Sequence, residues 1–220
     1  MNKLFAYGCS YTYGDHLPDH NSVNFSKEEC LADGSMRYEI NDWPSYLSWP
    51  NYVAQGLGRT CENKGISGAS NKQIWHAISN TNFNRGDIVM IMWTHPERTC
   101  IINEENEVDR IGIWRRHNHE ASKSYYINMF NSADAKIETA KHIQLAHSYL
   151  TSCNIEHYNA IFNKDWLIDV DWFTAPILST FMVDYQCDFG HDKIHPGPAT
   201  HKVVAENFIE NIKTKNYYER

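Results

Sequence analysis

The stretch "NRGDIVMIMW", residues 84–93, decides the fold class of this chain. A polar turn is followed by six consecutive apolar residues, Ile88 to Trp93, and a run of this length fits a strand that is buried on both faces. Strands of that kind are typical of parallel sheets that helices cover on both sides. The stretch therefore predicts an α/β domain.

On either side of this strand, segments with the hydrophobic pattern of strands alternate with segments that have the pattern of helices. Further strands are expected at 3–7, 59–64 and 155–162, and helices at 43–57, 72–79, 133–150 and 198–212. This alternation predicts a single domain over residues 1–220 with a mainly parallel central sheet. Loop insertions are expected near 15–42 and 99–130. Residues 163–190 lack a clear period, and we expect a loop with one short helix there.

The composition excludes several classes of protein. A net charge of −7 argues against a nucleic-acid partner, because such proteins concentrate lysine and arginine on one face. The longest apolar run is far shorter than the ~20 residues that a membrane-spanning helix needs. The first residues lack the apolar core of a secretory signal, so a cytoplasmic protein with free cysteines is expected.

Polar and small residues follow each of the first three expected strands. The first strand leads into "GCSYTYG" (8–14), which presents Cys9 and Ser10 side by side. The second leads into "GISGASN" (65–71), and the third into "THPER" (94–98). Because sites in parallel sheets form at the carboxyl ends of the strands, these turns are expected to meet in one crevice.

A fourth segment, "DKIHP" (192–196), offers a base for a serine nucleophile. A serine hydroxyl is a weak nucleophile until a neighbouring base accepts its proton. The spacing of Asp192 and His195 lets one turn bring the carboxylate to the imidazole nitrogen that is remote from Ser10. The sequence thus contains the elements of a Ser10, Asp192, His195 triad.

Together, "GCSYTYG", "NKGISG" and "DKIHP" resemble the motifs of SGNH (GDSL-like) hydrolases, and the resemblance spans the whole chain. It implies a three-layer, flavodoxin-like α/β sandwich. It also implies that Ser10 is the nucleophile and that Asp192 and His195 complete the triad. The activity implied is that of an esterase without a cofactor, which acts through an acyl-enzyme on a small-molecule or glycan ester with a carbohydrate or lipid-like carrier.

The same resemblance implies an oxyanion hole. In the family, two backbone N–H groups form it with an asparagine side chain that follows the third strand. The N–H groups carry over to Ser10 and Gly68. This chain reads "MWTHPER" at the third position, so His95 stands in the place of the asparagine. Thr94 and Asn71 are alternative donors.

Two further residues are candidates for substrate binding. Arg98 either holds an acidic group of the substrate or ties its loop to a nearby carboxylate. Trp93 is a core residue by default, since large aromatic side chains are usually buried, but a tryptophan here can also line a cleft for a sugar or an acyl group.

Three alternatives remain open at this point. The altered sequence at 94–96 allows a binding or structural module that keeps the hydrolase fold without turnover. Cys9, which replaces the aspartate usual in the family, is a rival reactive group. His191, Asp192 and His195 also offer ligand types for metal-assisted hydrolysis, although the proline that follows disfavours the helix that would align them.

Overall fold

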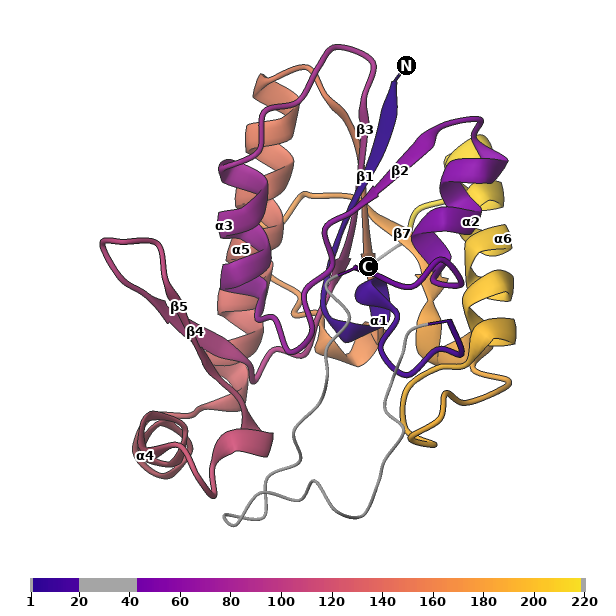
Figure 1. The fold of residues 1–220 in the computed structure, drawn as a ribbon. Coiled ribbons are helices and arrows are strands. Elements are labelled where there is room, and N and C mark those ends of the chain that lie inside the picture. The colour runs from indigo at the N-terminus through magenta and orange to yellow at the C-terminus, as the bar shows by residue number, and fades with distance from the viewer. Residues whose placement is uncertain (1, 20–42, 219–220) are drawn as a thin grey trace.

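The computed structural model describes residues 2–19 and 43–218 (Figure 1). The strands are β1 (Lys3–Tyr7), β2 (Thr60–Asn63), β3 (Ile88–Trp93), β4 (Thr99–Ile102), β5 (Val108–Ile111), β6 (Glu156–Ile161) and β7 (Ile177–Phe181). The α-helices are α1 (Ser10–Tyr13), α2 (Trp49–Gly56), α3 (Asn71–Ser79), α4 (Glu120–Asn128), α5 (Ser132–Ser152) and α6 (Pro198–Thr214). Three short 3₁₀ helices are η1 (Ile113–Arg115), η2 (Lys164–Trp166) and η3 (Met182–Tyr185).

The central sheet has the strand order β2-β1-β3-β6-β7, and neighbouring strands are parallel. This is the doubly wound order of flavodoxin-like folds, in which the connections reverse direction between β1 and β3. The predicted three-layer α/β sandwich with a parallel sheet is therefore confirmed. Loops that follow β1 and β3 flank the reversal point, which is where such folds place their sites.

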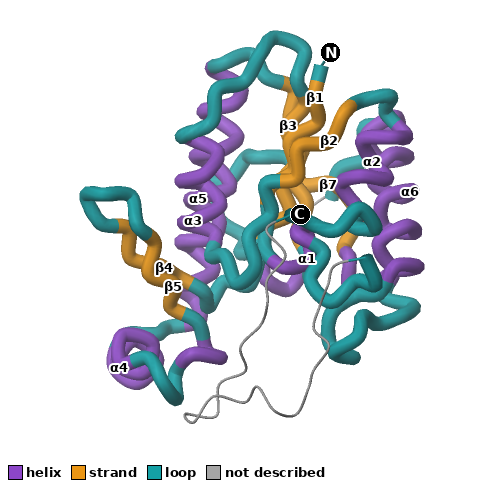
Figure 2. Tube along the Cα trace, in the orientation of Figure 1, coloured by secondary structure: helices purple, strands orange, loops and turns teal. Residues whose placement is uncertain are grey.

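Helices cover both faces of the sheet. In Figure 1, α3 and α5 lie on one side and α2 and α6 on the other, and Figure 2 shows the strands enclosed between these two purple layers. All six residues of β3 are buried, and they alternate between two cores, with Ile91 on the α3/α5 side and Met92 on the α2/α6 side. Burial on both faces explains why β3 has an uninterrupted apolar sequence.

Strand β7 was not expected, because residues 163–190 were predicted to be loop. Four of its five residues are buried, and it pairs with β6 on one edge. On its other edge the chain end lies alongside it, with the Tyr218 N–H donating to the Ile177 carbonyl (2.7 Å) and a bridge between Leu178 and Tyr217. Its burial comes from these distant partners, so the sequence of its own five residues shows no hydrophobic pattern typical of a strand.

The insertion expected near 99–130 is ordered rather than a loop. It forms the antiparallel β4–β5 hairpin, η1 and α4, which project from the α3/α5 side of the sandwich (Figure 1). Of the other expected insertion, 15–42, the part 20–42 lies outside the described residues. The helix expected over 43–57 begins only at Trp49, after the N-cap Ser48.

Two further expectations concern the described residues. None of their helices is both long and apolar enough to cross a membrane. Their five cysteines are free, as expected, and Cys153 and Cys187 are exposed.

Candidate active site

The first turn carries Cys9 and Ser10 at the carboxyl end of β1. Cys9 is the N-cap of α1, its carbonyl accepts the N–H groups of Thr12 and Tyr13 (2.9 Å each), and its thiol is buried in the α3/α5 core. Ser10 begins the helix and is 4% exposed. Because Cys9 faces the core, Ser10 is the candidate nucleophile in this turn.

The Asp192–His195 turn holds a carboxylate against an imidazole. Asp192 Oδ1 accepts the backbone N–H groups of Ile194 and His195 (3.0 Å each), and Oδ2 lies 2.6 Å from His195 Nδ1. Burial acts to raise the pKa of Asp192. These hydrogen bonds and the histidine lower it by more than burial raises it, so its net pKa is below the usual value. An ionised carboxylate only accepts, so Nδ1 carries the hydrogen and Nε2 of the neutral ring is a base.

Backbone contacts fix this turn on the fold. The Gly190 N–H donates to the His195 carbonyl (2.8 Å), and a bridge joins Phe189 to Pro196. Asp188 then caps α6 by accepting the N–H of Thr200 (2.7 Å). His195 is therefore placed by the start of α6.

The residue next to Ser10 contacts His195, the candidate base. Tyr11, next to Ser10, has its ring centroid 5.5 Å from that of His195. The Ser10 hydroxyl is oriented towards Cys9 Sγ (3.9 Å), and within the described residues no hydrogen bond joins Ser10 to His195. Catalytic hydrogen bonds often tighten only when substrate is bound, so this arrangement is compatible with the triad.

The second turn packs directly on the first. Asn63 donates to the Thr12 carbonyl (2.7 Å) and accepts the Gly65 N–H (2.9 Å). A Cβ at Gly65 would lie 2.5 Å from the Tyr13 nitrogen, so only glycine allows this approach. Gly68 has a φ of +70°. Among the described groups, the N–H groups of Ser10 and Gly68 donate to no acceptor, which an oxyanion hole requires.

Asn71 does not act as an oxyanion donor in this arrangement. Its carboxamide is buried, and its nitrogen donates to the Thr94 carbonyl (3.1 Å) and to the Thr139 hydroxyl (2.9 Å). Its oxygen accepts the Thr94 N–H (2.8 Å). Both amide hydrogens are therefore used to join the second and third turns to α5, and Thr94 itself is fully buried.

His95 also differs from its expected role. Its Nδ1 lies 3.2 Å from Glu97 Oε1, and its Nε2 lies 3.3 Å from the Tyr11 hydroxyl. Burial lowers the pKa of His95 and acts to raise that of Glu97, but hydrogen bonding to His95 helps to keep the net pKa of Glu97 low. The neutral ring then donates from Nδ1 to the carboxylate and accepts at Nε2 from Tyr11. In that tautomer His95 has no hydrogen left for an oxyanion.

Aromatic rings that the sequence did not reveal surround His95. Tyr11 stacks on Phe162 at 4.4 Å between centroids, Phe162 stacks on Trp166 at 5.5 Å, and Trp166 lies 4.1 Å from the His95 ring. Burial raises the pKa of Tyr11 to about 12, so its hydroxyl stays protonated. These rings form a wall that reaches His195 through Tyr11, and its members come from two segments, α1 and the residues that follow β6.

The two residues expected to bind substrate have different environments. The Trp93 side chain is fully buried, and its indole N–H donates to Asn159 (3.0 Å), so the prediction that it lines the site is wrong. Arg98 is half-buried, donates to the Thr94 hydroxyl (3.2 Å) and lies over the Trp114 ring at 4.7 Å. It ties the third turn to the insertion, and Trp114 in turn lies against Gly68.

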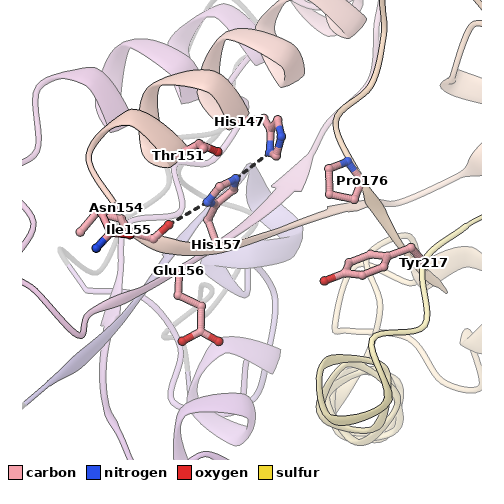
Figure 3. Close-up of a pocket in the computed structure, with 8 residues that line it drawn as sticks. All are labelled: His147, Thr151, Asn154, Ile155, Glu156, His157, Pro176 and Tyr217. Carbon is pink, nitrogen blue, oxygen red and sulfur yellow. Dashed lines mark hydrogen bonds between the residues drawn. The ribbon is translucent and has the colours of Figure 1, made fainter.

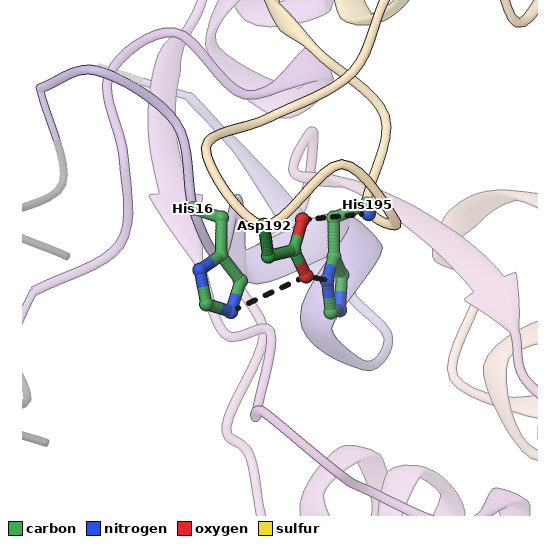
Figure 4. Close-up of side chains that lie close together, drawn as sticks. All are labelled: His16, Asp192 and His195. Carbon is green, nitrogen blue, oxygen red and sulfur yellow. Dashed lines mark hydrogen bonds and ion pairs between the residues drawn. The ribbon is translucent and has the colours of Figure 1, made fainter. Parts of the chain in front are cut away.

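His16 is a further residue that sequence reasoning missed. Its Nε2 lies 3.6 Å from Asp192 Oδ2, and its ring centroid is 4.9 Å from that of His195 (Figure 4). The metal alternative had named His191, but His191 is exposed and the cluster contains His16 in its place. Only the chain reversal after α1 brings His16 to a residue 176 positions away, so no local pattern could have shown it.

A second histidine pair lies in a pocket of about 450 Å³ at the amino ends of β6 and β7, the opposite end of the sheet (Figure 3). The His157 Nδ1 lies 2.9 Å from the Ile155 carbonyl, and its Nε2 lies 2.8 Å from His147 Nδ1. Glu156 is directed away from both rings. This pair therefore lacks the carboxylate that accompanies His195.

Comparisons with known proteins agree with this fold. No family model and no curated protein matches the chain. Among solved structures it is similar to a protein assigned to the lipolytic G-D-S-L family from Desulfitobacterium hafniense, with 11% identity, 96% of this chain and 99% of that chain covered, and a TM-score of 0.50.

It is also similar to an acetyl xylan esterase from the rumen bacterium Butyrivibrio proteoclasticus, with 9% identity and a TM-score of 0.52. That match covers 97% of this chain and 64% of the esterase. The resemblance to SGNH hydrolases is thereby confirmed for the fold.

Proposed function

We propose that this protein is a serine esterase. In the proposed cycle Ser10 Oγ attacks the ester carbonyl while His195 Nε2 accepts its proton, and His195 then gives that proton to the leaving alcohol. Water repeats the sequence on the acyl-enzyme and releases the acid. The N–H groups of Ser10 and Gly68 stabilise the oxyanion in both steps.

The observation that carries this proposal is the Asp192–His195 pair. Its 2.6 Å contact, with two backbone N–H groups on the same carboxylate, fixes the tautomer in which Nε2 is the base. The contact between the Tyr11 and His195 rings supports a place for this pair beside the turn that carries Ser10. A carboxylate held in this way supports a histidine that must take up and return a proton.

The substrate proposed is an ester of a carbohydrate or a lipid-like carrier. The similarity in fold to an acetyl xylan esterase suggests an acetylated sugar as the first compound to test. The half-exposed Trp114 ring lies next to Gly68 and can support a sugar face near the oxyanion hole. Arg98, which holds that ring, acts as a positioning residue in this view.

The test is hydrolysis of p-nitrophenyl acetate and acetylated xylan, together with covalent labelling by a fluorophosphonate. We expect Ser10→Ala and His195→Ala to lose about 10³-fold or more in turnover. His191→Ala, in the same loop but exposed, is the matched control and should retain activity. Activity that survives Ser10→Ala but not Cys9→Ala would contradict the serine mechanism.

A second candidate, a binding module with the hydrolase fold, is favoured by the state of the third turn. The side chain of His95 in that turn, and that of Asn71, which bonds to it from the start of α3, are both committed to other partners, so neither supplies a third oxyanion donor. A folded wild type that neither labels nor hydrolyses the esters, but binds a glycan, would favour this candidate.

A further inference from the structure

Three side chains from two loops gather at the edge of the candidate site. His16, Asp192 and His195 each offer one ligand atom, and these atoms all lie within 4.8 Å of one another (Figure 4). Their side chains are 18%, 16% and 22% exposed, so an ion in solution can reach them. Elsewhere in residues 2–19 and 43–218, no other group of three such ligands is present.

Backbone contacts hold the two loops together. The His191 N–H donates to the His16 carbonyl (3.0 Å), and His16 itself has a φ of +64°. A Cβ at Gly190 would lie 2.8 Å from that same carbonyl oxygen, so the loops touch where glycine permits it. Asp192 is anchored by its two backbone N–H contacts. The three ligands are therefore brought together by the fold rather than by chance rotamers.

We propose that His16 Nε2, Asp192 Oδ2 and His195 Nδ1 bind a divalent transition metal ion, with Zn²⁺ as the best fit, and that this ion inhibits the esterase. Two imidazoles and one carboxylate suit zinc, whereas Mg²⁺ and Ca²⁺ prefer oxygen ligands. Three protein ligands leave a fourth position for water.

One of the distances already suits a zinc ion, and the side chains must shift to adjust the others. Two ligands about 2.1 Å from a tetrahedral zinc ion lie roughly 3.4 Å apart. The observed 3.6 Å between His16 and Asp192 is close to that value. The 2.6 Å contact between Asp192 and His195 has to open, because the ion takes the place of the hydrogen between them.

Inhibition follows from the tautomer. The neutral His195 ring has one N–H hydrogen, on Nδ1, and when the metal binds Nδ1 that hydrogen passes through water to Nε2. The lone pair at Nε2 is then lost, so His195 no longer accepts the Ser10 proton. The ring keeps its charge and no redox step occurs. Metal binding is independent of the proposed function, whereas inhibition rests on it.

The experiment measures Zn²⁺ binding to the full, metal-free chain by calorimetry at neutral pH. We expect one site per chain, and we expect its affinity for Zn²⁺ to be about 10- to 100-fold lower in His16→Ala. His191→Ala and His147→Ala are the matched controls, and both should bind like the wild type. Binding that is absent, or equally tight in His16→Ala, would overturn the proposal.

A second measurement follows fluorophosphonate labelling of Ser10. Zn²⁺ should suppress labelling of the wild type, a chelator should restore it, and labelling of His16→Ala should no longer respond to Zn²⁺ at the same concentration. Labelling that continues while zinc occupies the site would overturn the inhibition. A protein that never labels but binds Zn²⁺ through His16 would refute the proposed function and leave the metal site standing.

Discussion

Two carboxylate–histidine pairs approach α1 from different loops, and they differ in what fixes them. In the Asp192–His195 pair the carboxylate also accepts two backbone N–H groups, and the imidazole Nε2 has no hydrogen-bond partner among the described residues. In the Glu97–His95 pair the contact is longer, 3.2 Å, and Nε2 is occupied by the Tyr11 hydroxyl.

A carboxylate beside a histidine therefore does not by itself make that histidine a catalytic base. Both carboxylates have lowered pKa values and are ionised at neutral pH, so both hold the same tautomer. What separates them is the access of substrate to Nε2. We infer that His195 does proton transfer and that His95 positions Tyr11.

The largest effect is expected from Asp192→Asn. The amide presents a donor to His195 Nδ1, which moves the ring hydrogen to Nε2 and removes the base, so turnover should fall by about 10³- to 10⁴-fold. Steady-state hydrolysis of p-nitrophenyl acetate measures this, with circular dichroism to verify folding. A loss of less than tenfold would place the base elsewhere.

The same change in the other pair, Glu97→Gln, should be much milder. Because His95 does not transfer the proton, we expect a loss of about tenfold or less, the effect of one hydrogen bond that positions a neighbour. The assay is the one used for Asp192→Asn, so the two losses can be compared directly. Equal losses would break the distinction between the pairs.

Tyr11→Phe probes the contact that occupies His95. It keeps the ring that stacks on Phe162 and removes the hydroxyl, so the expected loss in kcat/KM is about two- to tenfold. A loss of a hundredfold or more in kcat, with KM unchanged, would instead identify the Tyr11 hydroxyl as an oxyanion donor.

The smallest effect concerns stability at low pH. The folded-state pKa of Asp192 is lowered, so the unfolded state binds more protons than the folded state as the pH falls through about 4. The stabilisation is present above that pH and is lost progressively as the pH falls towards the lower, folded-state pKa. Urea unfolding at pH 6 and pH 3.5 should show wild type and Asp192→Asn converging in acid. A gap that widens instead would contradict the direction of the shift.

Much of the fold was predictable because local patterns and burial agree. The apolar run of β3 reflects burial on both faces, and the turn glycines marked where strands end. The Asp192–His195 spacing is local as well, so its contact followed from the sequence. These features depend on residues close together in the chain.

The remaining features depend on distant contacts. The partners of Tyr11 and His16 lie 84 and 176 residues away, on loops whose approach no local period encodes. The prediction for Trp93 was wrong because the last residue of a strand can face either the core or the site. Its hydrogen bond to Asn159 holds the side chain in the core. Strand β7 was missed because its burial comes from β6 and the chain end.

The pairing of the chain end with β7 has a consequence beyond the active site. An unpaired outer strand exposes a row of N–H and C=O groups that a second molecule can extend. Here the Tyr218 N–H and the Leu178–Tyr217 bridge occupy part of that row. Tyr217 and Tyr218 thus cover part of this sheet edge, and removal of their backbone contacts is expected to promote edge-to-edge association.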